Sequence, residues 1–318
     1  MQRRLCAAGF PPAPAAEAGE FCAATVASLR AFQEARGMRI DGQVDQDTWV
    51  GLVEASWRLG DRLLFLTAPN LRGDDVADLQ SLLGRIGFDC GRVDGILGPL
   101  TAGALVDFQR NCGLVADGTS GPVTLKAIQR VSSQTGTGPG IATVRERDQL
   151  RTRSSSLRGL RVVVGQFGGL SALTRVLARE LRLSGAVVIS VDEPDARVQA
   201  AVANSFEADV YLGFESRPGE PSRISYYAVP TFESSGGRSL AERLVAGFGA
   251  VAGVAPCLHG MRLQVLRETR MPAVLASLAD VRRTVDLSTD VTAVVRSALE
   301  AWTAKPLEDR SNPPGPTL

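Results

Sequence analysis

The chain has 318 residues, of which 44% are hydrophobic and 22% charged, and its formal net charge is +1. This length and composition predict a globular protein of two or three domains. A nearly neutral chain offers no basic surface for nucleic acid, and no run approaches the roughly 18 apolar residues of a membrane-spanning helix. We therefore expect no nucleic-acid partner and no membrane span.

The N-terminal part of the chain contains a degenerate internal repeat. The segment 31–37 (AFQEARG) matches 107–113 (DFQRNCG), and two further features recur at the same offset of 76 residues. These further matches are Asp41-Gly42 with Asp117-Gly118 and Thr48 with Thr124, and upstream Gly9-Phe10 matches Gly87-Phe88. Two copies of one pattern predict a repeated binding or packing unit.

Each copy has the pattern of a small helical unit. Apolar residues recur at i, i+3 and i+6, which places them on one face of a helix. They are Val26, Leu29 and Phe32 in the first copy and Ala102, Leu105 and Phe108 in the second. Gly37 and Gly113 are expected to end these helices, while Asp45 and Pro122 suit the start of the next helix.

The two copies resemble the peptidoglycan-binding module found at the ends of many bacterial cell-wall hydrolases. The second copy, residues 72–132, is nearly complete, and the first, residues 1–56, has Pro-Pro-Ala-Pro at 11–14 in place of its central Asp-Gly turn. The residues that carry the resemblance in the second copy are Leu79, Gln80, Leu83, Gly87, Phe88, Val93, Asp94, Gly95, Gly98, Thr101, Phe108, Gln109, Gly113, Asp117, Gly118 and Thr124.

This resemblance implies two all-α, three-helix repeats that bind peptidoglycan. The candidate ligand-binding residues are Asp41 and Arg36 in the first copy and Asp94, Arg110 and Asp117 in the second. The alternative for each of these positions is that the side chain holds the module together and contacts no sugar.

Two polar segments frame the rest of the chain. Residues 133–158 are rich in Ser, Thr, Gly and Arg and predict a flexible linker. Within it, the segment 151–156 (RTRSSS) leaves open a phosphorylation site or a plain solvated linker. Residues 305–318 are Pro-rich and polar and predict a disordered tail.

Between these segments, residues 159–304 alternate strand-like and helix-like patterns. Continuous apolar runs predict strands at 162–164, 187–189, 209–214 and 273–276. Amphipathic runs beginning near Leu173 and Leu240, and a closing run over 288–302, predict the intervening helices. Strands buried on both faces and separated by helices predict a doubly wound α/β sandwich.

This second domain resembles the zinc-dependent N-acetylmuramoyl-L-alanine amidases (type 3). The resemblance rests on Gly168-Gly169 after the first strand, on Ser239-Leu240-Ala241, and on the late segment 266–275 (LRETRMPAVL). The order of repeats followed by this domain is similar to that of mycobacterial-type amidase-like proteins of actinobacteria. That group includes a cytoplasmic regulator of peptidoglycan synthesis.

The resemblance implies a zinc site whose positions carry other residues in this chain. The first histidine ligand corresponds to Phe167, and the second falls at Phe214-Glu215. The loop that supplies the glutamate ligand is shortened at 170–172, and Ser277 stands at the catalytic glutamate. The whole chain has one histidine, His259, beside Cys257 in an expected turn, and two ligands alone make a poor metal site. We therefore expect no catalytic residue, metal or cofactor, although Glu215, Asp209 and Asp280 leave open a rebuilt acid–base pair.

These observations favour a pseudo-amidase. Such a protein binds peptidoglycan or a precursor, together with cell-wall-synthesis proteins, without hydrolysing peptidoglycan. The alternatives are an amidase with a rebuilt site and a plain wall-binding protein. The five scattered cysteines form no Cys-x-x-Cys pair and predict free thiols in the cytoplasm, with export as the alternative if the true start lies upstream.

Overall fold

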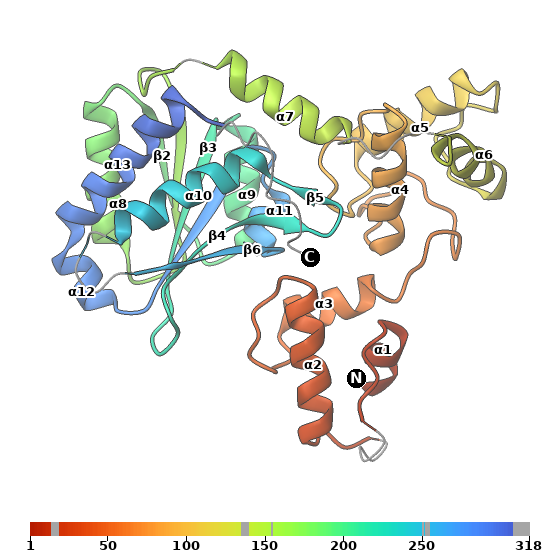
Figure 1. The fold of residues 1–318 in the computed structure, drawn as a ribbon, viewed down its shortest axis with the longest axis horizontal. Helices are drawn as coiled ribbons and strands as arrows, with labels where there is room; N and C mark the ends of the chain where they lie inside the picture. The colour runs from red at the N-terminus through yellow and green to blue at the C-terminus, as the bar shows by residue number, and fades with distance from the viewer. Residues whose placement is uncertain (14–18, 135–139, 154, 250, 252–254, 308–318) are drawn as a thin grey trace, which may run out of the picture. The chain divides into compact units, whose positions relative to one another are not determined.

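A computed structural model of the protein describes residues 1–13, 19–134, 140–153, 155–249, 251 and 255–307 (Figure 1). The chain divides into two compact units. The first comprises Met1–Arg145 and Val229–Phe232, and the second comprises Glu146–Ala228 and Glu233–Leu318. The predicted fold class, helical repeats followed by an α/β domain, is confirmed.

The first unit contains the two repeats, each with three helices. In the first repeat these are α1 (Gln2–Ala7), α2 (Ala23–Ala35) and α3 (Gln46–Glu54). In the second they are α4 (Asp74–Arg85), α5 (Pro99–Asn111) and α6 (Pro122–Ser132). The expected helix starts are confirmed, because the Asp45 side chain accepts a hydrogen bond from the Thr48 N–H at 2.7 Å and Pro122 lies in the first turn of α6.

Each repeat has its own small core, built from the predicted apolar faces. Leu29 and Phe32 are fully buried in the first repeat, as are Leu105 and Phe108 in the second. The matched phenylalanines form the same edge-to-face contact in both repeats. The ring centroids lie 5.6 Å apart for Phe10 and Phe32, and 5.5 Å apart for Phe88 and Phe108. The repeat in the sequence is therefore a repeat in the packing.

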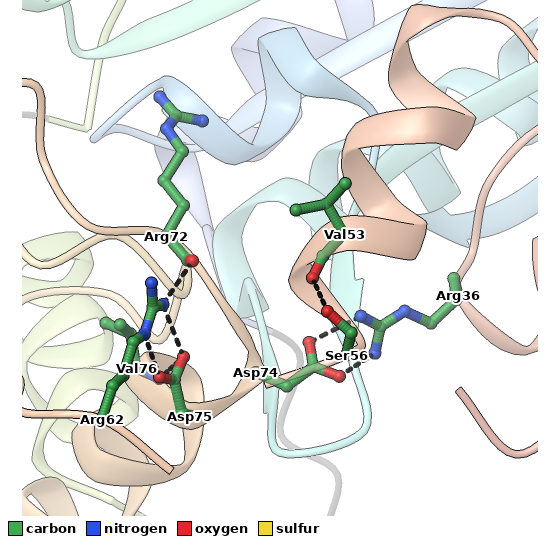
Figure 2. A network of polar contacts seen from close by, with 8 residues as sticks. All are labelled: Arg36, Val53, Ser56, Arg62, Arg72, Asp74, Asp75 and Val76. Atoms are coloured by element: carbon green, nitrogen blue, oxygen red, sulfur yellow. Dashed lines mark hydrogen bonds and ion pairs between the residues drawn. The ribbon is translucent and has the colours of Figure 1, made fainter. Parts of the chain in front are cut away.

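The segment that connects the repeats packs into the second one. Leu64 is buried in the core of that repeat, and its backbone exchanges two hydrogen bonds with Ser120. Arg62 in the same segment binds the buried carboxylate of Asp75 at 2.7 Å and the Arg72 carbonyl at 2.7 Å (Figure 2). The connection between the repeats is thus part of a folded unit.

The prediction of a flexible linker is wrong for part of that segment. Residues 141–152 form helix α7 (Ile141–Thr152), although Ser, Thr and Gly around them gave a linker composition. The helix carries few apolar residues, so the pattern on which a helix prediction depends is weak there. Residues 135–139 and Ser154 lie outside the described part of the chain. In the predicted tail, Leu307 packs against the core of the second unit, and residues 308–318 also lie outside the described part.

The second unit is built around a mixed sheet with strand order β2-β1-β3-β7-β4-β5, in which β6 also pairs with β4. The strands are β1 (Arg161–Gln166), β2 (Val187–Asp192), β3 (Val210–Ser216), β4 (Arg223–Val229), β5 (Phe232–Glu233), β6 (Cys257–Met261) and β7 (Ala273–Leu278). The four strands predicted from continuous apolar runs are β1, β2, β3 and β7, and they pair in parallel. Strand β4 runs antiparallel to β7, so the sheet is not purely parallel as the doubly wound pattern predicted.

Helices cover this sheet and complete its core. They are α8 (Ser171–Leu183), α9 (Ala196–Ser205), α10 (Ser235–Phe248), α11 (Gln264–Glu268), α12 (Val281–Asp286) and α13 (Ser288–Ala304). Helix α13 packs against both α8 and α10, and α9 packs against α11 (Figure 1). None of the described helices combines the length and apolar character that crossing a bilayer needs.

Candidate functional site

Each repeat contains a buried glutamine that holds an Asp-Gly turn. In the second repeat, the Gln109 side-chain amide donates to Asp117 Oδ1 at 2.9 Å, to the Thr119 carbonyl at 3.1 Å and to Thr124 Oγ1 at 3.2 Å. Its oxygen accepts the Gly118 N–H at 2.8 Å. One side chain therefore ties the turn to the start of the next helix.

The same arrangement occurs twice more in the repeats. Gln33 donates to Asp41 Oδ1 at 2.8 Å, to the Gln43 carbonyl at 3.1 Å and to Thr48 Oγ1 at 3.3 Å. Gln80 donates to Asp94 Oδ1 at 2.9 Å, to the Ile96 carbonyl at 3.1 Å and to Thr101 Oγ1 at 3.1 Å. In all three cases the glycine after the aspartate has a φ of +71° and donates its N–H to the glutamine oxygen. Glycine suits this backbone because it adopts positive φ at little cost.

The central turn that the first repeat was expected to lack is partly retained. Gln2, at the position of Gln80, accepts the Gly19 N–H at 3.0 Å and donates to Thr25 Oγ1 at 3.2 Å. Gly19 has a φ of +95°, which is positive like the φ of the other turn glycines. The Gln–Gly–Thr part of the arrangement is therefore present, although the sequence comparison placed the loss at residues 11–14, before this glycine.

These contacts give the three candidate aspartates a structural role. Each uses Oδ1 to accept from the glutamine and from the backbone N–H two residues further on. Within the described residues, the second carboxylate oxygen of Asp41 and of Asp117 accepts no side-chain or backbone hydrogen bond. The pKa of Asp117 is lowered by the Thr119 N–H and then by the Gln109 amide, so this carboxylate is charged at neutral pH. A ligand contact by these aspartates stays a prediction.

The two candidate arginines are in different surroundings. Arg36 lies just after α2 and forms a bidentate ion pair with Asp74, at 2.6 and 2.8 Å, in the first turn of α4 (Figure 2). Arg110 is an exposed side chain 3.6 Å from Asp107 on the same helix. Arg36 therefore joins the two repeats, whereas Arg110 remains open to solvent. A role of either arginine in binding a ligand stays a prediction.

In the second unit, the positions that the amidase resemblance singles out lie at the carboxyl ends of neighbouring strands. Phe167 follows β1, is half-buried, and donates its N–H to the Phe214 carbonyl at 3.1 Å. Phe214 is buried in the core beneath α8, α10 and α13. Glu215 and Ser277 lie opposite each other in the register of β3 and β7. The sheet thus brings together three of the positions that the sequence identified.

Glu215 and Ser277 form a buried hydrogen-bonded pair. The Ser277 hydroxyl donates to Glu215 Oε1 at 2.5 Å, and Arg217 contacts Glu215 Oε2 at 3.3 Å. Both Glu215 and Ser277 are almost fully buried. The carboxylate is therefore already bound by a hydroxyl and a guanidinium.

A second polar network organises the Gly-Gly turn after β1. The Gln166 side-chain oxygen accepts the Gly168 N–H at 2.7 Å and the Leu170 N–H at 3.2 Å. Its amide donates to Asp192, at the end of β2, and to Ser171 Oγ at 3.2 Å. Sequence analysis missed Gln166 because an isolated glutamine at a strand end matches no catalytic or binding motif.

The remaining candidate groups do not gather at this edge. Asp209 precedes β3 and accepts the Arg161 N–H at 2.8 Å, so it lies at the opposite end of that strand from Glu215. Asp280 caps α12 by accepting the Arg283 N–H at 3.0 Å. His259 is exposed on strand β6, not in the turn that its sequence suggested. Within the described part of the chain, no three His, Cys, Asp or Glu side chains are grouped closely enough to hold a metal ion.

Comparisons with known proteins agree with this architecture. Residues 1–52 and 72–128 match the peptidoglycan binding domain family. The N-acetylmuramoyl-L-alanine amidase CwlM of Mycobacterium tuberculosis is 32% identical over 307 residues, which cover 86% of this chain and 75% of CwlM. The chain belongs to the N-acetylmuramoyl-L-alanine amidase family. Both resemblances, to the repeats and to the amidases, are thereby confirmed.

Other amidases match parts of the chain. A probable N-acetylmuramoyl-L-alanine amidase of Bacillus licheniformis is 32% identical over 139 residues, covering 39% of each protein. Among solved structures, the amidase Ami1 of Mycobacterium smegmatis aligns with a TM-score of 0.40 and 11% identity, over 46% of this chain and 98% of Ami1. The amidase of Clostridium difficile 630 aligns with a TM-score of 0.38 and 14% identity, over 46% of this chain and 98% of its own.

The glutamine arrangement in the repeats had a signal in the sequence. Gln33 and Gln109 each precede the aspartate that they bind by 8 residues and the threonine that they bind by 15. The Phe-Gln pair is visible in both copies of the repeat. The role of the glutamine could not be predicted from it, because that role depends on the turn folding back onto the helix. In this amidase-family chain, the most regular polar feature therefore supports the backbone of the repeats.

Proposed function

We propose that this protein is a pseudo-amidase that binds peptidoglycan or a precursor, together with envelope-synthesis proteins, without hydrolysing peptidoglycan. The observation that carries the proposal is the set of residues at two of the family's metal-ligand positions and at its catalytic-glutamate position. Phe167, Glu215 and Ser277 stand there, in the same chain as repeats that match a peptidoglycan binding domain. A binding function needs the repeats, and hydrolysis by the family's chemistry needs the metal.

The side chains at these positions do not fit a zinc ion. A catalytic zinc takes three protein ligands from imidazole, thiolate or carboxylate and keeps an open position for water. Phe167 offers no donor atom, and the Ser277 hydroxyl donates to Glu215. Glu215 is the one carboxylate of the three, and it is shared between Ser277 and Arg217. No step of a metal-assisted hydrolysis can be assigned to these residues.

A regulatory role would follow from linked binding. If a wall ligand and a protein partner both prefer one conformation of the chain, each raises the affinity of the other by the same factor. The repeats supply the ligand-binding half of this scheme. The partner is proposed to be an envelope-synthesis protein, in keeping with the resemblance to amidase-like regulators.

A plain wall-binding protein is the second candidate, and the match of the repeats alone favours it. It predicts affinity for purified peptidoglycan without a specific protein partner. An amidase with a rebuilt site is the third, and the separation of Asp209 from Glu215 along β3 argues against it.

The test combines co-sedimentation with purified peptidoglycan and cross-linked affinity purification from cells. We expect the full chain to sediment with peptidoglycan and to capture the same envelope-synthesis protein repeatedly. A matched variant, Gln80→Leu, removes the side chain that organises a turn in the second repeat and should weaken sedimentation. Sedimentation without a reproducible partner would leave only wall binding, and failure to sediment would contradict the proposal.

We also propose a cytoplasmic location. All five cysteines are unpaired in the structure. Free thiols are typical of a reducing compartment. Labelling of intact cells with a membrane-impermeant thiol reagent should leave exposed Cys112 and Cys257 unmodified, and labelling of both would place the protein outside the membrane.

A further inference from the structure

We infer that the exposed face of helix α8 in the second unit is a docking surface for an anionic lipid bilayer. This inference goes beyond the proposed function and does not depend on it, because it concerns another part of the chain and another chemical partner. It is compatible with the proposed cytoplasmic location, since the cytoplasmic leaflet of a membrane carries a negative surface potential.

The first observation is a local excess of positive charge, which the net charge of +1 conceals. The whole chain has 35 Lys and Arg residues against 34 Asp and Glu. Residues 157–191, by contrast, contain five arginines and a single carboxylate, Glu180. The arginines are Arg158, Arg161, Arg175, Arg179 and Arg182. All of them except Arg161 are exposed, and three lie on α8.

The charges of the α8 arginines are not neutralised by the rest of the chain. Among the described residues, no carboxylate forms an ion pair with Arg175, Arg179 or Arg182. Arg175 Nε donates to the Ser171 carbonyl at 3.3 Å, and Arg182 donates to the Val188 carbonyl at 2.9 Å. A guanidinium that binds a neutral carbonyl keeps its full positive charge. This side of the helix therefore presents positive charge that an external anion can pair with.

The second observation is that exposed apolar side chains lie among these arginines. Val176 is 39% exposed and Leu183 is 71% exposed. Val176, Arg179 and Leu183 recur at i, i+3 and i+7, so they share one face of the helix. The opposite face packs into the core through Leu173, Leu177 and Leu181. Apolar side chains bordered by cations are typical of helices that lie on a membrane surface.

Helix α8 lies at an edge of the sheet, where its exposed face meets solvent. Strand β2 is the edge strand, and α8 packs over β1 and β2 and against α13 (Figure 1). Arg158 lies against Gly185, just after the C-terminal end of the helix. We define the α8 patch as Arg158, Arg175, Val176, Arg179, Arg182 and Leu183.

Two carboxylates border the α8 patch and reduce its charge. Glu180 is half-buried on the same helix. Asp192 lies at the N-terminal end of α8, where it accepts a hydrogen bond from Ser171 Oγ at 2.9 Å. The four arginines of the patch therefore outnumber the neighbouring carboxylates by two.

The composition of the α8 patch favours a bilayer over an acidic protein. Protein interfaces are built around aromatic side chains in a desolvated centre, and the patch consists of arginine, valine and leucine alone. A bilayer requires no shaped complement. Arginine guanidinium groups can bind lipid phosphates bidentately, while Val176 and Leu183 contact the boundary between headgroups and acyl chains.

The expected binding is reversible and depends on salt. Each arginine close to an anionic bilayer raises binding about fivefold, and the attraction falls off within about 10 Å at 0.1 M salt. With two arginines in excess, the patch should favour an anionic over a neutral bilayer by about 25-fold.

The test measures flotation of the full chain with phosphatidylcholine vesicles, with and without one third phosphatidylglycerol, at low and at high salt. We expect the partition coefficient at low salt to be about 25-fold higher on the anionic vesicles, and the difference to disappear at high salt. Equal partition onto both kinds of vesicle, or none onto either, would overturn the inference. Sedimentation with peptidoglycan, measured on the same preparation, tests the proposed function separately.

Matched variants test whether the α8 patch is the surface that binds. The double variant Arg175→Gln with Arg179→Gln should lose the preference for anionic vesicles, a decrease of about 25-fold. The control, Arg130→Gln with Arg270→Gln, removes the same charge from exposed positions on α6 and before β7, and its partition should stay close to that of the unaltered protein. Thermal unfolding of both variants should match the unaltered protein, because all four side chains are exposed.

Two results with these variants would contradict the assignment. Equal losses in the two double variants would mean that net charge, and not the α8 patch, determines binding. Capture of an acidic protein that depends on Arg175 and Arg179, without flotation on anionic vesicles, would assign the patch to a protein partner and overturn the inference.

Discussion

The repeats and the amidase-like domain each carry a family signature, but the polar residues of that signature make different kinds of hydrogen bond in the two regions. In the repeats, Gln109 and its counterparts keep the same set of hydrogen bonds to a turn and a threonine. In the second domain, Glu215 and Ser277, at positions that the amidase resemblance singles out, bind each other. The glutamines that support the backbone recur with the same bonds, whereas the two residues that the resemblance associates with chemistry are hydrogen-bonded to each other. The following predictions test this contrast.

The largest effect is expected where a buried charge in the repeats would lose its partner. Arg62→Leu leaves the Asp75 carboxylate buried without its guanidinium, which should cost about 3–5 kcal/mol of unfolding free energy. Arg36→Ala removes a partly exposed pair and should cost less than about 1 kcal/mol. Denaturant titrations read by hydrogen exchange in α4 and, separately, in α8 measure both.

The Arg62 variant should leave exchange in α8 unchanged, since the second unit has its own core. Adding Asp75→Asn should recover part of the lost stability by removing the unpaired charge. Equal costs for Arg62→Leu and Arg36→Ala would contradict the assignment of burial as the cause.

The glutamine arrangement should give the next largest effect. Gln80→Leu deletes the side chain that bonds Asp94, Thr101 and the Gly95 N–H, and should cost the repeats about 2–4 kcal/mol at about 1 kcal/mol per net hydrogen bond. Gln129→Leu, at an exposed position on α6, is the control and should change stability little. A small cost at Gln80 would mean that the turn stands without its glutamine.

A smaller effect is expected from the pair in the second domain. Ser277→Ala removes one hydrogen bond to the Glu215 carboxylate and should lower the stability of that domain by about 1–2 kcal/mol. Sedimentation with peptidoglycan should stay at the level of the unaltered protein, because the repeats are untouched. Loss of wall binding in this variant would show that the second domain contacts the ligand.

The smallest expected effect is a difference in thiol reactivity between two cysteines, one in each repeat. The backbone N–H of Thr25 and then its hydroxyl lower the pKa of the Cys22 thiol, whereas burial raises the pKa of Cys90 to about 12. A lower pKa means more thiolate at pH 8, so iodoacetamide should modify Cys22 well before Cys90. Mass spectrometry of a time course measures this order, and earlier modification of Cys90 would contradict the burial of that thiol.

Patterns of apolar residues predicted the helices and strands whose burial shows in their own sequence. Apolar spacing placed α2 and α5, and continuous apolar runs placed β1, β2, β3 and β7. Sequence patterns are weaker where an element depends on its surroundings. Strand β4 was missed because it pairs antiparallel with a strand that lies much later in the chain, and α7 was missed because its apolar spacing is poor.

The candidate site was predictable in position but not in its contacts. Resemblance to the amidases placed Phe167, Glu215 and Ser277 at strand ends, where the structure also has them. The bond between Glu215 and Ser277 spans 62 residues and depends on the register of β3 and β7. The pairing of Arg36 with Asp74 spans 38 residues and depends on how the connecting segment folds. Both contacts arise from tertiary packing, which spacing along the chain does not encode.

The most direct test of the pseudo-amidase proposal is the zinc content of the purified protein, measured together with its cleavage of peptidoglycan. The proposal predicts no stoichiometric zinc and no release of stem peptides, with or without added zinc. One tightly held zinc per chain, or cleavage that disappears in Glu215→Ala, would contradict it and show that this strand edge is a working active site.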